Sequence, residues 1–93
     1  MNIEPDTLIV QAPAALAADV GTEIVIMGMD SGLYLALDPV GRAVWSRLAQ
    51  PCSFAALCDG LSEVYEGARA TIEQDVRTLL GTLYEAKVIE IRP

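Results

Sequence analysis

The stretch Gly32-Leu-Tyr-Leu-Ala-Leu-Asp-Pro-Val-Gly-Arg-Ala-Val-Trp-Ser-Arg-Leu48 is where the chain changes its hydrophobic period. Up to Leu37 the apolar residues alternate or run together, as in a β-strand, and after Pro39 they recur at helical spacing. Asp38 stands at the join. An aspartate can accept a hydrogen bond from the unpaired N–H groups of a first helical turn, and a proline at the first helical position loses nothing by lacking its own N–H. The sequence therefore predicts that a strand ends at Leu37 and that a helix begins at Pro39.

The residues before this stretch predict strands. Thr7–Gln11 is a short β-branched, apolar run that is typical of an edge strand, whereas Ala14–Ala18 is long enough only for one helical turn. Val20–Met29 is a nearly continuous apolar run and predicts a second strand with both faces covered. Met29–Gly32 predicts a hairpin turn, because Asp and Ser favour turn backbones and glycine tolerates a positive φ. Leu33–Leu37 then returns as a third strand, whose leucines we expect to face the helices.

Two amphipathic helices follow the change of period. The first is predicted from Pro39 to Ala49, and the second begins after Pro51, capped by Ser53, and ends at Gly67. Spacings of three and four residues predict the buried stripes, which are Val40, Val44, Trp45 and Leu48 in the first helix and Phe54, Leu57, Cys58, Leu61, Val64 and Tyr65 in the second.

A third helix is predicted over Ala70–Ala86, with Thr71 as a cap and an apolar stripe of Ile72, Val76, Leu79, Leu80 and Leu83. Val88–Ile91 alternates and predicts a terminal strand. The elements are therefore three strands, three helices and one strand, which is an α+β fold.

Length and composition fit one domain over residues 1–93, with residues 1–6 expected to be flexible. The chain is 53% hydrophobic, which supplies enough aliphatic side chains for a core. No apolar run approaches the roughly 20 residues that span a bilayer, and the N-terminus lacks the basic start of a secretion signal. We therefore expect a cytoplasmic protein without membrane contact.

Charge is distributed unevenly along the chain. The net charge is −7, and the first 41 residues carry six carboxylates with no Lys or Arg. Nucleic-acid affinity depends largely on Lys and Arg that neutralise phosphates. The acidic half therefore predicts a neutral or basic partner and no nucleic acid.

Three helices followed by a strand would also describe a winged helix that binds DNA, and this is the alternative reading. Its recognition helix would be the third one. That helix sets Arg69, Arg77 and Lys87 against Glu73, Asp75 and Glu85, so it has no excess of positive charge. DNA binding is therefore the weaker hypothesis.

The sequence offers no catalytic or metal-binding cluster. It contains no His, no Gly-rich phosphate loop and no nucleophile elbow. Cys52 and Cys58, the two cysteines, would lie about 9 Å apart along a helix at about 1.5 Å per residue, too far for a disulfide. Two thiols without a histidine also make a poor metal site. We therefore expect no enzyme activity, no metal and no cofactor.

An interaction module remains. A small sheet backed by helices has an edge strand with free N–H and C=O groups, to which an extended peptide can add as a further strand. Such docking requires an open strand and a neighbouring apolar wall, and no catalytic residue.

The ordered succession of Tyr34 to Asp38, Gly41 to Trp45 with Leu48, Leu57 through Leu61 to Tyr65, Asp75-Val76 with Leu79-Leu80 and Leu83, and Val88-Ile89 resembles the PqqD-like family. These are the RiPP recognition elements, which include the stand-alone proteins of split lasso-peptide systems. The likeness covers residues 20 to 91. It implies a three-stranded antiparallel sheet followed by a winged-helix-like trio of helices.

The resemblance also implies a function, which is binding the leader segment of a ribosomally made precursor peptide as an extra strand on the third strand. Gly32, Leu33, Tyr34, Leu35, Ala36 and Leu37 would supply the pairing backbone, and Asp75, Val76, Thr78, Leu79, Thr82 and Leu83 would line the opposite wall. The implied partners are the precursor peptide and a leader peptidase or other modifying enzyme. A lasso-type system, to which the Leu37–Trp45 stretch looks closer, would add an ATP-dependent cyclase, and a quinone-cofactor type would add a radical enzyme. Without peptide, the open edge could pair with a second copy to form a homodimer.

Overall fold

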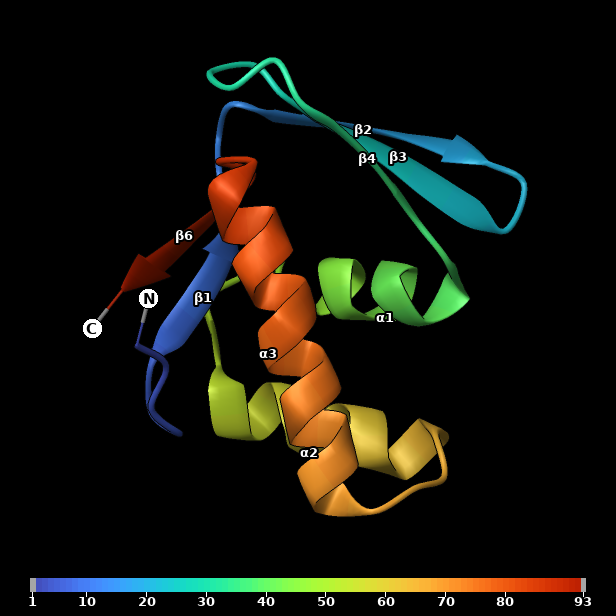
Figure 1. Cartoon of the computed structure of the whole chain (residues 1–93), viewed down its shortest axis with the longest axis vertical. Coiled ribbons are helices and arrows are strands. Elements are labelled where there is room, and N and C mark those ends of the chain that lie inside the picture. The colour runs from blue at the N-terminus through green and yellow to red at the C-terminus, as the bar shows by residue number, and fades with distance from the viewer. Residues whose placement is uncertain (1, 93) are drawn as a thin grey trace.

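The computed structural model describes residues 2–92 and contains two small antiparallel sheets and three helices (Figure 1). The strands are β1 (Leu8–Gln11), β2 (Ala15–Val20), β3 (Glu23–Gly28), β4 (Tyr34–Leu37), β5 (Cys52–Ser53) and β6 (Ile89–Arg92). The helices are α1 (Pro39–Arg47), α2 (Phe54–Val64) and α3 (Arg69–Glu85). The α+β fold and the predicted succession from the hairpin strand through three helices to a terminal strand are confirmed.

The predicted three-stranded antiparallel sheet is present, but its strands differ from those expected. It consists of β2, β3 and β4 in that order, and we call it the β3 sheet. The prediction of one strand over Val20–Met29 was wrong, because the chain reverses at Gly21-Thr22 between β2 and β3. Gly21 has φ +66°, a conformation that glycine adopts freely and that a two-residue hairpin turn needs. The helical turn expected at Ala14–Ala18 is likewise replaced by β2.

The strand predicted over Thr7–Gln11 is β1 (Leu8–Gln11), but the expected edge position was wrong. β1 lies at the centre of a second sheet of order β5-β1-β6, which we call the β1 sheet, and it pairs with both neighbours. Its partners lie far away in the sequence, so no local pattern could show them. The terminal strand β6 thereby ties the C-terminal end of the chain to its N-terminal part.

The segment expected to be flexible packs against the body over its described part. Ile3 is buried, and its carbonyl accepts a hydrogen bond of 2.7 Å from the guanidinium of Arg77. The backbone N–H of Glu4 donates to Thr7 Oγ1 at 2.9 Å. Met1 lies outside the described residues.

The N-caps predicted for α1 and α2 are present in the structure, and the one predicted for α3 is not. The Asp38 carboxylate accepts from the Gly41 N–H at 2.8 Å at the start of α1, and the Ser53 hydroxyl accepts from the Ala56 N–H at 3.1 Å at the start of α2. The expected Thr71 cap was wrong: α3 already begins at Arg69, with Ala68 as its N-cap and no side-chain bond. The start of α3 is instead tied to α2 by Arg69, whose guanidinium donates to the Asp59 carboxylate at 2.7 Å.

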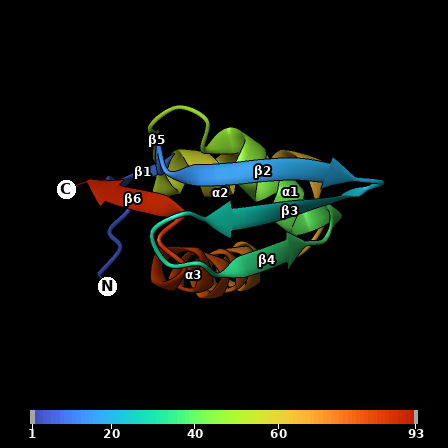
Figure 2. The ribbon, with the colours of Figure 1, turned by 90° about the horizontal axis from the view of Figure 1, so that it is seen from above.

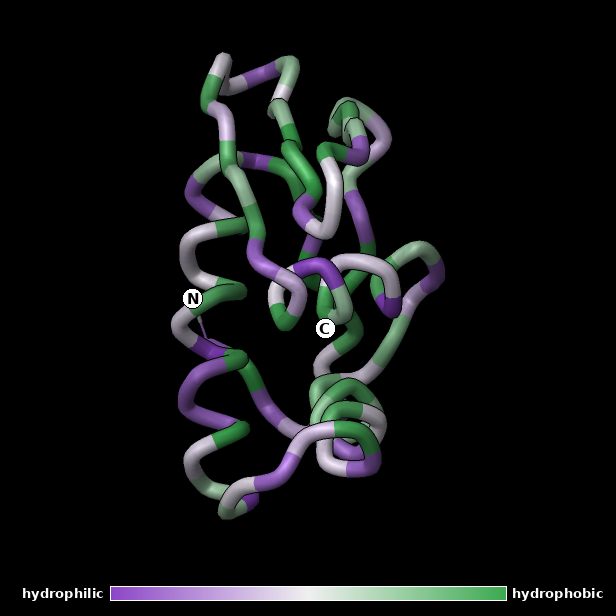
Figure 3. The backbone as a smooth tube through the Cα atoms, turned by 90° about the vertical axis from the view of Figure 1, so that its right-hand side faces the viewer, coloured by the Kyte–Doolittle hydropathy of each residue, from purple (hydrophilic) through white to green (hydrophobic). Residues whose placement is uncertain are grey.

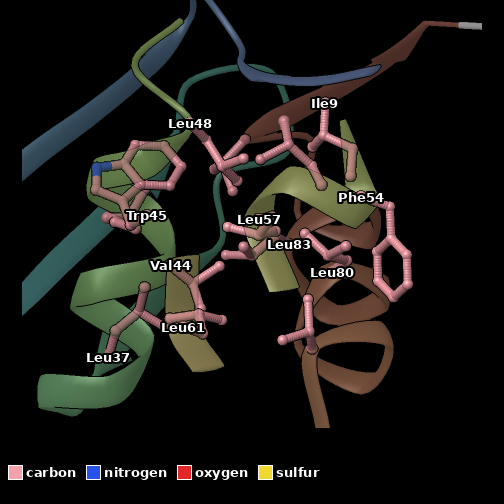
Figure 4. Close-up of a cluster of buried hydrophobic side chains, with 14 of the residues drawn as sticks. Ile9, Leu37, Val44, Trp45, Leu48, Phe54, Leu57, Leu61, Leu80 and Leu83 are labelled. Atoms are coloured by element: carbon pink, nitrogen blue, oxygen red, sulfur yellow. The ribbon is translucent and has the colours of Figure 1, made fainter. Parts of the chain in front are cut away.

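The core lies between the helices and the inner faces of both sheets (Figure 4). Its fully buried side chains come from every layer and include Ile9, Ile26, Val44, Leu48, Leu57, Leu80 and Leu83. Along α3 the hydrophobic residues return about once per turn on the side that faces the body, while hydrophilic ones occupy the other side (Figure 3). This one-sided pattern fixes which side of α3 stays exposed.

Two residues of the predicted stripes, Val40 and Val64, are exposed instead, at 47% and 61%. At about 100° per residue, each lies at the margin of its stripe, roughly 70–90° from the centre of the buried side. The exposure of a side chain at such a margin depends on what packs beside the helix, and nothing in the described chain covers either residue completely.

No helix of the described chain is both long and apolar enough to cross a membrane.

Candidate functional site

The strand β4 leaves one side of its backbone open. It lies at the edge of the β3 sheet and pairs only with β3, in the register Ile26↔Leu35 and Met27↔Tyr34 (Figure 2). In an antiparallel pair, residues that bond to the neighbour alternate with residues whose N–H and C=O groups point the other way. The Gly28 N–H donates to the Leu33 carbonyl at 3.0 Å, which fixes this alternation. The backbone N–H and C=O groups of Leu33, Leu35 and Leu37 therefore point toward β3, and those of Tyr34 and Ala36 point outward, away from the sheet.

These outward groups have no backbone partner within residues 2–92. They amount to two N–H donors and two C=O acceptors, two residues apart on one exposed edge. A strand edge of this kind binds another extended chain readily.

The turn before β4 is fastened to the end of α3. The Ser31 hydroxyl donates to the Ala86 carbonyl at 2.6 Å and accepts from the Leu33 N–H at 3.2 Å. Gly32 has φ +72°, and its N–H donates to the Gly28 carbonyl at 2.7 Å. A Cβ on Gly28 would collide with the Ala86 carbonyl, so the close approach of the turn to α3 depends on glycine at position 28. These bonds hold the turn before β4 against the C-terminal end of α3.

The exposed side of α3 forms a wall beside β4. Asp75, Thr78 and Thr82 are exposed, and Leu79 is half-buried. Val76 and Leu83 turn toward the core, and Leu83 has no exposed surface. The accessible part of the wall named from the resemblance is therefore Asp75, Thr78, Leu79 and Thr82.

The six residues expected to supply the pairing backbone differ in exposure. Tyr34 and Leu33 are 70% and 51% exposed, and Gly32 and Ala36 are exposed as well. Leu35 is half-buried and Leu37 is buried beneath the sheet. The leucine face therefore meets the helices at Leu35 and Leu37, as expected, while Leu33 extends beyond them.

Two adjoining hollows lie at the end of β4. The larger, about 550 Å³, is lined by Glu23, Ala36, Leu37, Asp38, Val40, Gly41, Asp75 and Leu79. The smaller, about 250 Å³, is mainly apolar and is lined by Val40, Leu61, Tyr65, Glu66, Gly67, Thr71, Ile72, Asp75 and Val76. They share Val40 and Asp75, so they form one groove that runs from the strand edge toward α2. A hollow that is apolar at depth and open at the rim can hold a side chain of a docked segment.

Val40 and Tyr65 are groove residues that sequence reasoning missed, because both were assigned to buried helix stripes. The marginal position of Val40 on its helix was the available signal. Tyr65 follows α2 and lines the groove from the far side, which no local pattern indicates.

The groove is negatively charged. Glu23, Asp38 and Asp75 line its larger hollow, and none of the three carboxylates forms an ion pair within residues 2–92. Arg42 is the arginine nearest to Asp38 in the sequence. Its guanidinium forms an ion pair of 2.5 Å with Asp19 and donates to the Glu23 backbone carbonyl. The groove therefore favours a segment that carries positive rather than negative charge.

The arginines of α3 are engaged elsewhere, which argues against a DNA-recognition helix. Arg69 bonds to Asp59 at 2.7 Å and to Glu73 at 2.9 Å, and its hydrogen bond to Asp59 raises the pKa of the guanidinium. Arg77 lies over the ring of Phe54, 4.4 Å from its centre, and donates to the Ile3 carbonyl. Both side chains would have to give up these bonds to meet phosphates.

The two thiols are free, and neither lines the groove. Cys58 is buried and Cys52 is half-buried, and burial raises the pKa of both thiols. Arg47 partly offsets the effect at Cys52. Raised pKa values make these groups poor nucleophiles at neutral pH. Within residues 2–92 there is also no cluster of three metal-ligating side chains.

Comparisons with known proteins agree with this geometry. Residues 23–89 match the profile of a family described as Coenzyme PQQ synthesis protein D (PqqD). The solved structure of TbiB1 in complex with the TbiA(beta) leader peptide is similar, with a TM-score of 0.79 and 28% identity over 87% of this chain and 94% of that chain. A lasso peptide synthetase B1 complexed with its leader peptide matches with a TM-score of 0.75 and 24% identity, over 88% of this chain and 96% of that chain, and shows the shared fold. No curated protein matches the sequence.

Proposed function

Because the chain belongs to the PqqD family, whose profile spans residues 23–89, we propose that it binds the leader segment of a ribosomally made precursor peptide on β4. The observation that carries the proposal is the open edge of β4 beside a groove lined by Asp75 and Leu79 of α3. The likeness to TbiB1, solved as a leader-peptide complex, supports it at 28% identity. The protein itself performs no chemistry in this proposal.

The geometry of β4 defines how a leader would lie. An antiparallel strand would enter at the groove beside α1 and leave near the Met29–Gly32 turn, since β4 runs in the opposite direction. Its bonded residues would pair with Tyr34 and Ala36. The residues between them would point to the other side, toward Leu79 and Asp75 of α3, because side chains alternate along a strand.

In this arrangement the backbone hydrogen bonds supply affinity, and the side chains of the leader supply selectivity. Four backbone hydrogen bonds, at about 1 kcal/mol net each, hold any extended segment, whatever its sequence. The alternate side chains enter an apolar groove with a carboxylate rim, so an apolar residue flanked by a basic one fits best. The leader would be selected by these side chains.

We extend the proposal to the partners of the complex. The bound precursor would be handed to a leader peptidase or another modifying enzyme in the cytoplasm. Both similar structures come from leader-peptide complexes, and one is named a lasso peptide synthetase, which supports a lasso-type system with an ATP-dependent cyclase over a quinone-cofactor system. Without leader, a second copy would pair through the same edge, and leader binding would displace it.

The test is a titration of the ¹⁵N-labelled chain with the leader of a precursor encoded beside its gene. We expect low-micromolar or tighter affinity, and protection from hydrogen exchange that appears on binding at the Tyr34 and Ala36 amides. The Leu35 amide, already bonded to β3, should be protected in both states. A scrambled leader is the control, and a DNA duplex at low salt should give no gel shift. If no leader encoded nearby binds, the proposal is wrong.

A further inference from the structure

On the premise of the proposed function, we propose that a hollow at the C-terminal end of α3 holds the part of the precursor that follows the leader strand, and that this hollow favours a basic segment. The hollow, which we call the α3-end hollow, has a volume of about 430 Å³. It lies between the Met29–Gly32 turn, the end of α3 and the start of β6 (Figure 1). None of its lining residues lines the groove beside β4, so it is a separate place on the chain.

The direction of the bound leader points to this hollow. An antiparallel leader on β4 leaves the strand at the Met29–Gly32 turn. Asp30 of that turn lines the α3-end hollow. The turn is itself fastened to the end of α3, because the Ser31 hydroxyl donates to the Ala86 carbonyl. The precursor residues that follow the paired segment therefore pass the rim of the hollow.

Ile89 gives the hollow free backbone groups. The Ala12 N–H donates to the Val88 carbonyl at 2.8 Å, so by alternation the N–H and C=O groups of Ile89 point away from β1. Both groups lack a hydrogen-bond partner within residues 2–92, although Ile89 is only 4% exposed. Backbone groups that are covered to this extent are nearly always paired. A segment of chain in the hollow would supply partners for them.

The charges around the hollow favour a basic segment. Its lining contains the carboxylates of Asp30, Glu85 and Glu90 and the amine of Lys87. Glu90 is paired with Arg92 at 3.1 Å, whereas neither Asp30 nor Glu85 forms an ion pair within residues 2–92. The C-terminal end of α3 adds a partial negative charge. A lysine or arginine of the precursor would therefore be stabilised here.

Lys87 has a backbone conformation in which glycine is more usual. Its φ is +60°, and its N–H donates to the Tyr84 carbonyl at 3.0 Å. The next N–H, of Val88, donates to the Leu83 carbonyl at 3.2 Å, and the two bonds end α3 and turn the chain into β6. Glycine adopts this conformation without steric cost. Lys87→Gly therefore removes a positive charge from the hollow and keeps the fold.

Tethering distinguishes the precursor from other occupants of the hollow. A segment whose leader is already bound on β4 meets the hollow at a high effective concentration, so a few hydrogen bonds and one ion pair are enough to hold it. A free peptide or a second copy lacks this advantage. A second copy would also bring its own acidic half, with no Lys or Arg in the first 41 residues, toward the acidic rim. One precursor would therefore be held at two places, the β4 edge and the α3-end hollow.

The experiment compares two peptides of the same system on the whole chain. One is the shortest C-terminally truncated leader that still protects the Tyr34 and Ala36 amides from exchange, and the other is the whole precursor. We expect the precursor to bind about 10-fold more tightly, which corresponds to about 1.4 kcal/mol. Replacing the Lys and Arg residues of the added segment with alanine should remove this gain.

Two variants should change precursor affinity in opposite directions. Glu85→Lys should lower it about 5-fold or more, and Lys87→Gly should raise it about 2-fold to 3-fold, because the first adds positive charge to the hollow and the second removes it. The matched control is Glu63→Lys, the same substitution at an exposed residue of α2 that lines neither the α3-end hollow nor the groove beside β4. Affinity for the truncated leader should change less than about two-fold in all three variants.

A second measurement uses the unmodified chain, so that a folding defect in a variant cannot decide the result. The precursor should shift the amide signals of Lys87 and Ile89, and the truncated leader should leave both in place. The Ala17 amide, on the far edge of the β3 sheet, should shift with neither peptide.

The inference is overturned if the precursor binds no more tightly than the truncated leader, or if the Lys87 and Ile89 amides do not respond to it. It is also overturned if Glu63→Lys weakens precursor binding as much as Glu85→Lys does. Failure of the proposed function is a different outcome, in which no leader protects the Tyr34 and Ala36 amides.

Discussion

Replacing Ala36 with proline should weaken leader binding without unfolding the protein. The N–H of Ala36 points away from β3, so Ala36→Pro removes a donor that the described structure does not use and puts the proline ring where a leader strand would pair. Proline is tolerated on an edge strand when its missing N–H would face outward. The folded chain therefore loses no backbone bond.

The size of the effect follows from the number of bonds. Tyr34 and Ala36 offer two bonded pairs, and loss of the Ala36 pair removes two hydrogen bonds, worth about 2 kcal/mol together. Since about 1.4 kcal/mol corresponds to a tenfold change, the Kd should rise about 30-fold. Fluorescence anisotropy with a labelled leader measures the Kd, and urea denaturation measures the stability of the variant.

The matched control is Ala17→Pro, which makes the same substitution on the other edge of the sheet. The Met29 N–H donates to the Ala14 carbonyl, and by alternation the backbone of Ala17 also faces outward, but from β2. Leader affinity of this variant should match the wild type. The strand-addition reasoning is refuted if Ala36→Pro weakens binding less than about threefold, or if Ala17→Pro weakens it equally.

Three further predictions concern stability and the thiols. Leu80→Ala should lower the free energy of unfolding by about 2–5 kcal/mol in urea denaturation, because Leu80 is fully buried; a loss below about 1 kcal/mol would contradict the packing described. Asp38→Ala should lower it by about 1 kcal/mol, because the Gly41 N–H loses its acceptor, whereas an unchanged melting curve would show that the cap contributes nothing. Cys58 should resist Ellman's reagent at neutral pH, because burial both shields the thiol and raises its pKa, and it should react fully in guanidinium chloride; fast reaction in the native state would show that the site opens. Cys58→Ala is the control that assigns the signal between the two thiols.

Prediction from the sequence succeeded where the deciding interactions are local. Asp38 and Ser53 cap their helices by accepting hydrogen bonds from N–H groups three residues further on, so each cap and its donor lie in one short stretch. It failed at Gly21, where a two-residue turn is hidden between apolar residues that read as one strand. It also failed for β1, whose neighbours β5 and β6 lie more than 40 residues away in the chain.

Only part of the candidate site could be predicted from the sequence. The strand segment and the helix that face each other were named from the resemblance, and their exposures became clear in the structure. Leu83 belongs to the core, whereas Val40 and Tyr65 line the groove. These assignments depend on which surfaces approach one another, and helical periodicity alone gives only the direction of each side chain.

The sequence by itself determined the helices, two of their caps, the acidic N-terminal half and the lack of a catalytic histidine, because each depends on residue type or on neighbours within one or two turns. Only the tertiary structure decided which strand edge stays open, which face of the β3 sheet stays uncovered and where the groove runs. Strand pairing depends on contacts between distant segments, and an edge stays open when no other strand of the chain pairs with it.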